Sequence, residues 1–237
     1  MSLSKKSMLT LIVPTLLCLA AVALPSAALA YSAAGDFSTS SNPNGVWSYG
    51  WSTTLGSAFN LSSSNTTSYA GDGLGGWLSA LSPDGSPLVL HNGTLNPITT
   101  QNSTFQPGQL ALGPGFFLQY SVLRWTAPSS GTFSIAATFS GLSSLGDSSA
   151  VNILHDGVSI FASNVIGTPS PTSYSGNQNI IAGDTIDFTV GVGSDESYDE
   201  DLTALSASIV AVPEPGALGL VGAGFGCLLS LRFLKRK

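Results

Sequence analysis

Short apolar runs separated by clusters of Gly, Ser, Thr and Asn fill the chain from residue 31 to residue 211. This pattern predicts an all-β sandwich or barrel, and no long amphipathic period indicates a helix. The region shows neither an internal repeat nor a linker, so we expect one domain. Its clearest predicted strands are residues 116–125, 131–139, 150–155, 158–163, 185–192 and 204–211.

Two of these segments carry strong local signals. Residues 132–139 largely alternate polar and apolar side chains, as a half-buried strand does. His155, Asp156 and Gly157 lie between two predicted strands, and Asp-Gly is a preferred sequence of tight hairpin turns. We therefore predict a hairpin here, with His155 solvated in its turn.

The first thirty residues have the parts of a secretory signal peptide. A lysine pair precedes an apolar stretch over residues 8–24, and Ala28 and Ala30 supply the small-x-small cleavage pattern. We expect this segment to act as a signal helix and signal peptidase to release a chain that begins at Tyr31. An uncleaved membrane anchor is the alternative.

The charges are divided unevenly along the chain. Residues 31–211 contain twelve acidic residues and a single basic one, Arg124, which gives a formal net charge of −11. Such a surface repels nucleic acid, so we expect no nucleic-acid partner, while cations, neutral sugars and matrix polymers stay open. Both cysteines lie outside this region, so a packed core must stabilise it without a disulfide.

The last 26 residues combine a proline motif, an apolar run and a basic end. Val212-Pro213-Glu214-Pro215 precedes sixteen uncharged residues, which as a helix would span roughly 24 Å. Snorkelling of the first basic residue lets a transmembrane helix extend over about residues 216–234. The positive-inside rule places the basic end in the cytoplasm; its residues are Arg232, Lys235, Arg236 and Lys237.

This three-part tail over residues 212–237 resembles the PEP-CTERM sorting signal of bacteria that make extracellular polysaccharide. The resemblance implies recognition by an exosortase, a membrane cysteine peptidase that processes such chains near the motif. It makes Pro213, Glu214 and Pro215 recognition positions rather than catalytic ones. A proline-rich linker before an ordinary membrane anchor is the alternative.

A second resemblance concerns the exported domain. Residues 123–133, Leu-Arg-Trp-Thr-Ala-Pro-Ser-Ser-Gly-Thr-Phe, resemble a segment of carbohydrate-binding-like jelly rolls in exported bacterial proteins. In those domains a tryptophan strand leads through Pro-x-x-Gly into a core strand, and residues 183–188 and 204–210 agree with the same layout. The resemblance implies a jelly-roll β-sandwich over residues 31–211 but constrains no ligand.

Residue types that commonly catalyse reactions are scarce in this domain. His91 and His155 lie in turn-like sequence, and neither accompanies a Gly-x-Ser-x-Gly nucleophile motif. Glu196 and Glu200 are the only glutamates of the domain and share one acidic run, which is a weak basis for the carboxylate pair of a glycosidase. We therefore expect a protein that is not an enzyme.

Two groups of residues are candidate binding sites. The acidic run offers five carboxylates that could coordinate calcium, although an exposed, solubilising loop is the alternative; they belong to Asp195, Glu196, Asp199, Glu200 and Asp201. Trp47, Tyr49 and Trp51 are spaced by two, so in a strand they share one face. That face could stack sugar rings or pack in the core.

Together these features predict an exported, non-catalytic protein of the cell envelope or the extracellular polysaccharide matrix, where it would be a structural or adhesive component. A lectin-like carbohydrate-binding module, with or without calcium, is the alternative function. A glycoside hydrolase is a more distant one.

Overall fold

The computed structural model describes residues 29–146 and 148–213. The predicted signal helix, the transmembrane helix and the basic end lie outside these residues, as do Ala28, Glu214 and Pro215. In the described part of the chain, no helix is long and apolar enough to cross a membrane.

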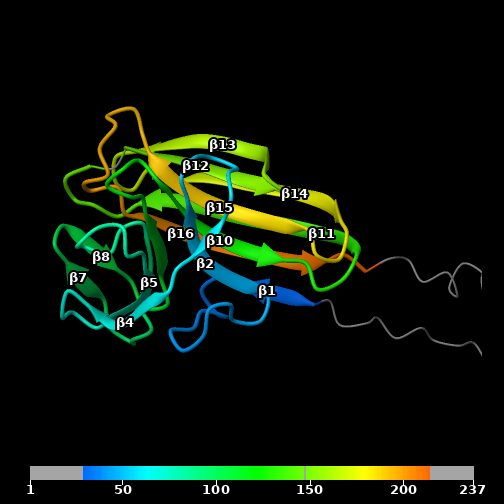
Figure 1. Cartoon of the computed structure of the whole chain (residues 1–237), viewed down its shortest axis with the longest axis horizontal. Coiled ribbons are helices and arrows are strands. Elements are labelled where there is room, and N and C mark those ends of the chain that lie inside the picture. The colour runs from blue at the N-terminus through cyan, green and yellow to red at the C-terminus, as the bar shows by residue number, and fades with distance from the viewer. Residues whose placement is uncertain (1–28, 147, 214–237) are drawn as a thin grey trace, which may run out of the picture. The chain divides into compact units, whose positions relative to one another are not determined.

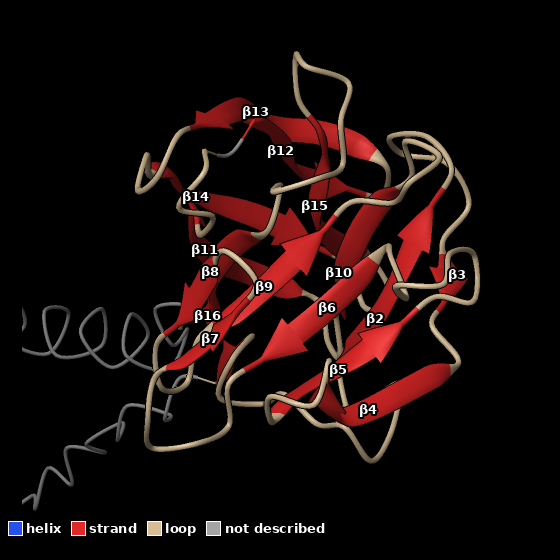
Figure 2. Cartoon of the chain, turned by 90° about the vertical axis from the view of Figure 1, so that its left-hand side faces the viewer, coloured by secondary structure: helices blue, strands red, loops and turns tan. Residues whose placement is uncertain are grey.

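The described residues form two main antiparallel β-sheets and one small hairpin (Figures 1 and 2). The first sheet has the order β14-β11-β16-β9-β6-β5-β4, with β1 also paired to β16. Its strands are β1 (Ala30–Ser32), β4 (Ser64–Tyr69), β5 (Leu74–Leu78), β6 (Leu88–His91), β9 (Leu110–Gly113), β11 (Gly131–Gly141), β14 (Thr172–Ile180) and β16 (Thr203–Ala211).

The second sheet has the order β13-β12-β15-β10-β2-β3. It consists of β2 (Trp47–Ser52), β3 (Asn60–Leu61), β10 (Tyr120–Thr126), β12 (Ser148–His155), β13 (Val158–Ile166) and β15 (Thr185–Val192). The small hairpin pairs β7 (Ile98–Thr100) with β8 (Ser103–Phe105).

The connectivity confirms the predicted β-sandwich of jelly-roll type. From β9 onward the chain passes repeatedly between the two sheets, and β12 and β13 form the predicted hairpin within one sheet. One predicted strand was too long at its start. Residues 116–119 form a turn in which Leu118 has φ 65° and its N–H donates to the Gly115 carbonyl, and β10 begins only at Tyr120.

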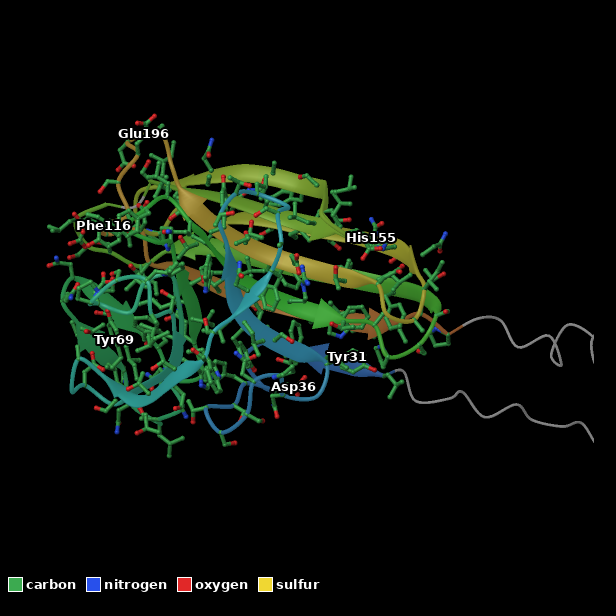
Figure 3. The ribbon with its side chains drawn as sticks, viewed as in Figure 1. Tyr31, Asp36, Tyr69, Phe116, His155 and Glu196 are labelled. Atoms are coloured by element: carbon green, nitrogen blue, oxygen red, sulfur yellow. The ribbon has the colours of Figure 1, made fainter. Side chains whose placement is uncertain are left out.

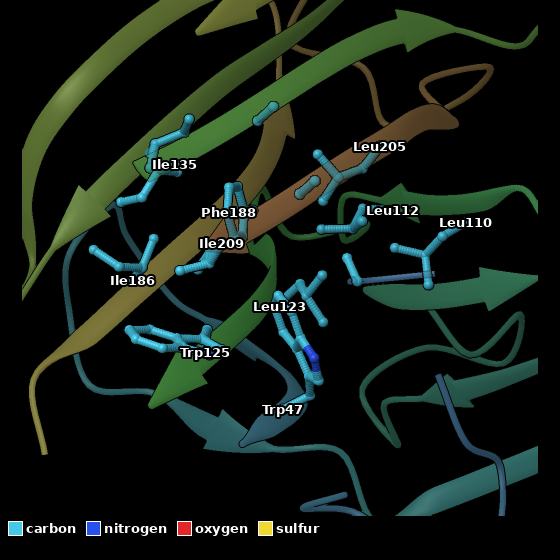
Figure 4. Packing of buried hydrophobic residues seen from close by; sticks show 14 of the residues in the cluster. Trp47, Leu110, Leu112, Leu123, Trp125, Ile135, Ile186, Phe188, Leu205 and Ile209 are labelled. Atoms are coloured by element: carbon cyan, nitrogen blue, oxygen red, sulfur yellow. The ribbon is translucent and has the colours of Figure 1, made fainter. Parts of the chain in front are cut away.

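The main core lies between the two sheets and is rich in large aromatic and branched side chains (Figure 4). Trp125 and Phe188 are fully buried, on the neighbouring strands β10 and β15. A smaller core lies between β6, β9 and the β7–β8 hairpin around Leu90 and Phe105. Both cores and all described strands belong to one compact unit, which among the described residues runs from Leu29 to Val212, so we expect this segment to fold without the terminal ends.

The two ends of the sandwich differ in what they carry (Figures 1 and 3). β1 begins and β16 ends side by side, with Ala30 opposite Val210 and the Ala211 N–H donating to the Leu29 carbonyl at 2.9 Å. Both continuations of the chain therefore leave from this exit end. The opposite end, called the distal end below, carries the 114–119 turn, the acidic run and Tyr69.

Candidate functional site

Two of the three aromatic residues predicted to stack sugars are core residues instead. Trp47 and Tyr49 are 1% and 0% exposed, and their rings contact Phe188 and Trp77 inside the sandwich. The shared face of this strand is the inner face of its sheet, so the sugar-stacking prediction was wrong for both residues. Trp51 is partly exposed at the end of the same strand.

The acidic run is spread over several environments. Glu200 accepts hydrogen bonds from Asn102 at 2.7 Å and from the Ser143 hydroxyl, and Asp201 is buried and accepts from the Ser148 N–H at 2.9 Å. Asp195 and Asp199 remain exposed. These carboxylates do not converge on one point in the described structure, and calcium binding by this loop stays a prediction.

A cleft of about 90 Å³ opens at the distal end, beside this loop. Tyr69 comes to it from the end of β4, Asp84 from the loop before β6, and Tyr198 and Asp199 from the acidic run. Its floor includes Leu88 and Gly113 on β6 and β9. Tertiary structure thus brings together two tyrosines and several carboxylates from three separate parts of the sequence.

Asp84 is held firmly by its own loop. Its Oδ1 accepts hydrogen bonds from the Ser86 N–H at 3.1 Å, the Ser86 hydroxyl at 2.9 Å and the Ser82 hydroxyl. Desolvation opposes ionisation, but these hydrogen bonds outweigh it and lower the pKa of Asp84 below its ordinary value. The cleft therefore contains a fixed, ionised carboxylate at neutral pH.

The two tyrosines lie within the field of Asp84. The Tyr69 hydroxyl donates to the Asp84 backbone carbonyl at 3.2 Å. Burial and then the charge of Asp84 raise the pKa of both Tyr69 and Tyr198. Both hydroxyls therefore stay protonated near neutral pH. The single proton of the Tyr69 hydroxyl is already donated to the Asp84 carbonyl, so its oxygen is available to a ligand as an acceptor.

A second, shallower depression of about 510 Å³ adjoins the cleft and shares Tyr69, Asp84 and Gln101 with it. It runs along β4, the edge strand of its sheet, where Ser64, Thr66 and Ser68 contribute hydroxyl groups. We name the cleft and this depression together the distal groove. Its lining combines a row of hydroxyl groups with the Tyr69 ring and the Asp84 carboxylate.

Exposed aromatic side chains border the groove. Phe116 and Phe117 are 54% and 62% exposed, and the Phe116 ring packs edge-on against Tyr198 with centroids 5.3 Å apart. These residues were expected to begin a strand, and their place in the tight 114–119 turn explains why they remain in solvent. They extend the aromatic surface beyond Tyr198.

The histidines lie away from this groove. His91 is half-buried against Phe37, with ring centroids 4.9 Å apart, and burial lowers its pKa. His155 lies near the exit end (Figure 3), where its Nε2 is 3.3 Å from Asp184 Oδ2, so it is not the freely solvated turn residue we expected. His155, Asp156 and Asp184 are the one group of three potential metal ligands found among the described residues.

Part of the predicted processing region is described. Val212 directly follows β16, and its N–H donates to the Thr132 carbonyl at 2.8 Å, while Pro213 is the last described residue. Ala30 and Tyr31, on either side of the predicted signal cleavage site, lie in β1. Neither signal peptidase nor exosortase processing is tested by these positions.

No protein-family model matches this chain, and no curated protein matches it either. Solved structures with partial similarity include a family 35 carbohydrate binding module from Clostridium thermocellum, at 11% identity, 49% of this chain, 78% of that chain and a TM-score of 0.28. Another is CBM51 from Clostridium perfringens GH95 in complex with methyl-galactose, at 13% identity over 52% of this chain and 87% of that chain, with a TM-score of 0.34. Rabbit GITRL matches at 17% identity over 40% of this chain and 74% of that chain, with a TM-score of 0.25. These comparisons assign no family.

The sequence pattern did not reveal the groove. Tyr69 and Asp84 stand in loop-like, Ser-rich and Gly-rich sequence, and Tyr198 stands within the acidic run. A tyrosine in the middle of an acidic run is the one sequence signal that could have indicated the groove. The proximity of Tyr198 to Tyr69, however, depends on long-range pairing that a linear pattern does not contain.

Proposed function

We propose that this protein is an exported, membrane-sorted protein of the cell surface or extracellular matrix, and that its β-sandwich binds carbohydrate in the distal groove. The observation that carries the proposal is the groove itself, where Tyr69 and Tyr198 flank the ionised Asp84 beside a hydroxyl-lined strand edge. Aromatic rings pack against the apolar faces of sugars, while fixed polar groups bind their hydroxyls.

The position of the groove supports this function. The chain continues toward Pro213 and the predicted membrane tail from the exit end, whereas the groove lies at the distal end. The described residues that lead into the tail, Val212 and Pro213, therefore leave the groove open to a ligand. In this proposal the domain acts as an adhesive component without catalysing a reaction.

The charge of the groove narrows the class of ligand. Asp84, Asp199, Glu200 and Asp201 all line the cleft, and Arg124 is bound to Asp187 elsewhere in the domain. Coulomb repulsion therefore disfavours polysaccharides rich in uronic acid. We expect neutral or amino-sugar polymers to bind better.

Binding can be measured on residues 29–213 by calorimetry with neutral, amino-sugar and uronic-acid oligosaccharides. We expect Tyr198→Ala to weaken binding about tenfold, which corresponds to about 1.4 kcal/mol, and Tyr198→Phe to retain most of it because the ring remains. Asp84→Asn should also weaken binding, because it removes the fixed carboxylate of the groove. Asp195→Asn is its matched control, since Asp195 is an exposed acid outside the groove. Absence of binding to every sugar, with and without calcium, would contradict the carbohydrate function.

Two further measurements separate the other parts of the proposal. Deletion of residues 212–237 from the full chain should change the location of a tagged protein, and an unchanged location would contradict the sorting function. Release of reducing ends from a bound glycan would favour the glycoside hydrolase alternative over a binding module.

A further inference from the structure

Three potential metal ligands meet near the exit end of the sandwich, far from the groove in the fold. His155 ends β12, Asp156 follows it in the hairpin turn, and Asp184 immediately precedes β15. One ligand atom from each of the three side chains lies within 4.8 Å of the others. The carbohydrate proposal gives these residues no role.

The sheet itself holds the three residues together. β12 and β15 are antiparallel neighbours, with His155 opposite Ile186, and the Asp156 N–H donates to the Thr185 carbonyl at 3.0 Å. The turn before β15 thus lies directly beside the β12–β13 hairpin. A ligand would find these side chains already positioned by backbone pairing.

Hydrogen bonds also fix both carboxylates. Asp156 Oδ1 accepts from the Thr185 N–H at 2.7 Å and from its hydroxyl at 3.2 Å, while the Oδ2 atom faces His155 at 3.9 Å. Asp184 Oδ2 accepts from the Ile181 N–H at 2.8 Å, which lowers the pKa of Asp184. Both groups are therefore oriented rather than free to turn into solvent.

The separations agree with tetrahedral coordination. Zinc binds histidine nitrogen and carboxylate oxygen at about 2.0–2.2 Å, so two ligand atoms of a tetrahedral site lie about 3.3 Å apart. His155 Nε2 is 3.3 Å from Asp184 Oδ2 and 3.9 Å from Asp156 Oδ2. Without an ion the first pair is a long hydrogen bond, which a bound ion would replace. The Asp156 carboxylate lies within 4.8 Å of the other two ligand atoms, and its Oδ2 would have to approach His155 Nε2 by about 0.6 Å to complete the set.

We propose that His155, Asp156 and Asp184 form a site for one small divalent transition-metal ion of the zinc type, with solvent at its fourth position. Imidazole nitrogen with two carboxylates is a ligand set that zinc accepts. Calcium prefers six to eight oxygen ligands, which this group does not supply. The ion would tie the β12–β13 hairpin to the turn before β15, and the domain's net charge of −11 would favour its approach.

The test is calorimetric titration of tag-free residues 29–213 with zinc chloride and with calcium chloride, after removal of metals by chelator. We expect one zinc ion per domain, no calcium binding at this site, and a higher unfolding midpoint with zinc. His155→Ala and Asp184→Asn should each weaken zinc binding at least about tenfold. His91→Ala and Asp195→Asn are the matched controls and should bind as the unaltered domain does.

A spectroscopic measurement keeps the test decisive if a variant folds poorly. Zinc should shift the ring resonances of His155 and leave those of His91 unchanged in the unaltered domain. Failure of the domain to bind zinc at about 100 µM, or undiminished binding in a folded His155→Ala variant, would overturn the proposal. Either result would leave carbohydrate binding at the distal groove unaffected.

Discussion

Arg124 is the only basic residue between residues 29 and 213, and it is bound to a buried carboxylate. Its Nε and one terminal nitrogen donate to the two oxygens of Asp187 at 2.7 and 2.8 Å, and its guanidinium lies 4.4 Å from the centre of the Phe59 ring. The side chains of Arg124 and Asp187 are 24% and 6% exposed. The two residues are also direct partners across β10 and β15.

Replacement of Arg124 by methionine should therefore leave the Asp187 carboxylate uncompensated within the sheet. Removal of one partner from a buried ion pair lowers the free energy of unfolding by about 3–5 kcal/mol. Because Arg124 is partly exposed, we expect a loss at the lower end of this range, about 3 kcal/mol. For a domain of this size, that loss corresponds to a fall of roughly 6–12 °C in the unfolding midpoint. Urea titration followed by tryptophan fluorescence would measure the change.

The double variant Arg124→Met with Asp187→Leu tests the cause. If the uncompensated charge is responsible, the double variant should recover most of the stability, because apolar groups of similar volume often replace a buried pair without loss. The reasoning would be refuted if Arg124→Met alone lowered the free energy of unfolding by less than about 1 kcal/mol. It would also be refuted if the double variant were as unstable as Arg124→Met.

Two other predictions concern the core and the distal loop. Burial raises the pKa of Tyr49 to about 12. The unfolded chain therefore loses this proton at a lower pH than the folded domain does, and the free energy of unfolding should fall as pH rises from about 10 to 12. Unfolding followed by circular dichroism should show a smaller loss of stability at alkaline pH in Tyr49→Phe, and an equal loss would contradict the assignment. Glu200→Ala should remove the two charge-assisted hydrogen bonds that Glu200 accepts from Asn102 and Ser143, and should lower the free energy of unfolding by about 2–3 kcal/mol. Hydrogen exchange should increase near residues 101–103 and 142–146, whereas Glu196→Ala, an exposed neighbour, should leave it unchanged.

Several features of this protein could be predicted from local sequence alone. The β-rich class, the 150–163 hairpin and five of the six predicted strands follow from alternation and turn residues, which act over a few positions. Residues 116–119 misled the prediction because Phe-Phe-Leu is strongly apolar, and only the tight turn at Leu118 keeps these side chains exposed. The charge distribution is likewise a property of the sequence, and with it the expectation against nucleic acid.

The sites depended on long-range pairing. Whether the Trp47 face pointed inward could not be decided from a spacing of two, because both faces of a strand have that period; packing of β2 against the opposite sheet decided it. The acidic run is one group by sequence. In the fold, Asp195 and Glu196 are exposed outside the groove, whereas Asp199, Glu200 and the buried Asp201 line it.

The sequence by itself determined the terminal signal patterns, the acidic balance and the β-sandwich class, because these depend on composition and on neighbours along the chain. Only the tertiary structure brought Tyr69, Asp84 and Tyr198 to one groove, and His155 beside Asp184 at the other end. The physical reason is that sheet pairing joins residues separated by tens to more than a hundred positions, through backbone hydrogen bonds that every residue type except proline can both donate and accept. Such pairings leave no periodic signal in the side chains they bring together.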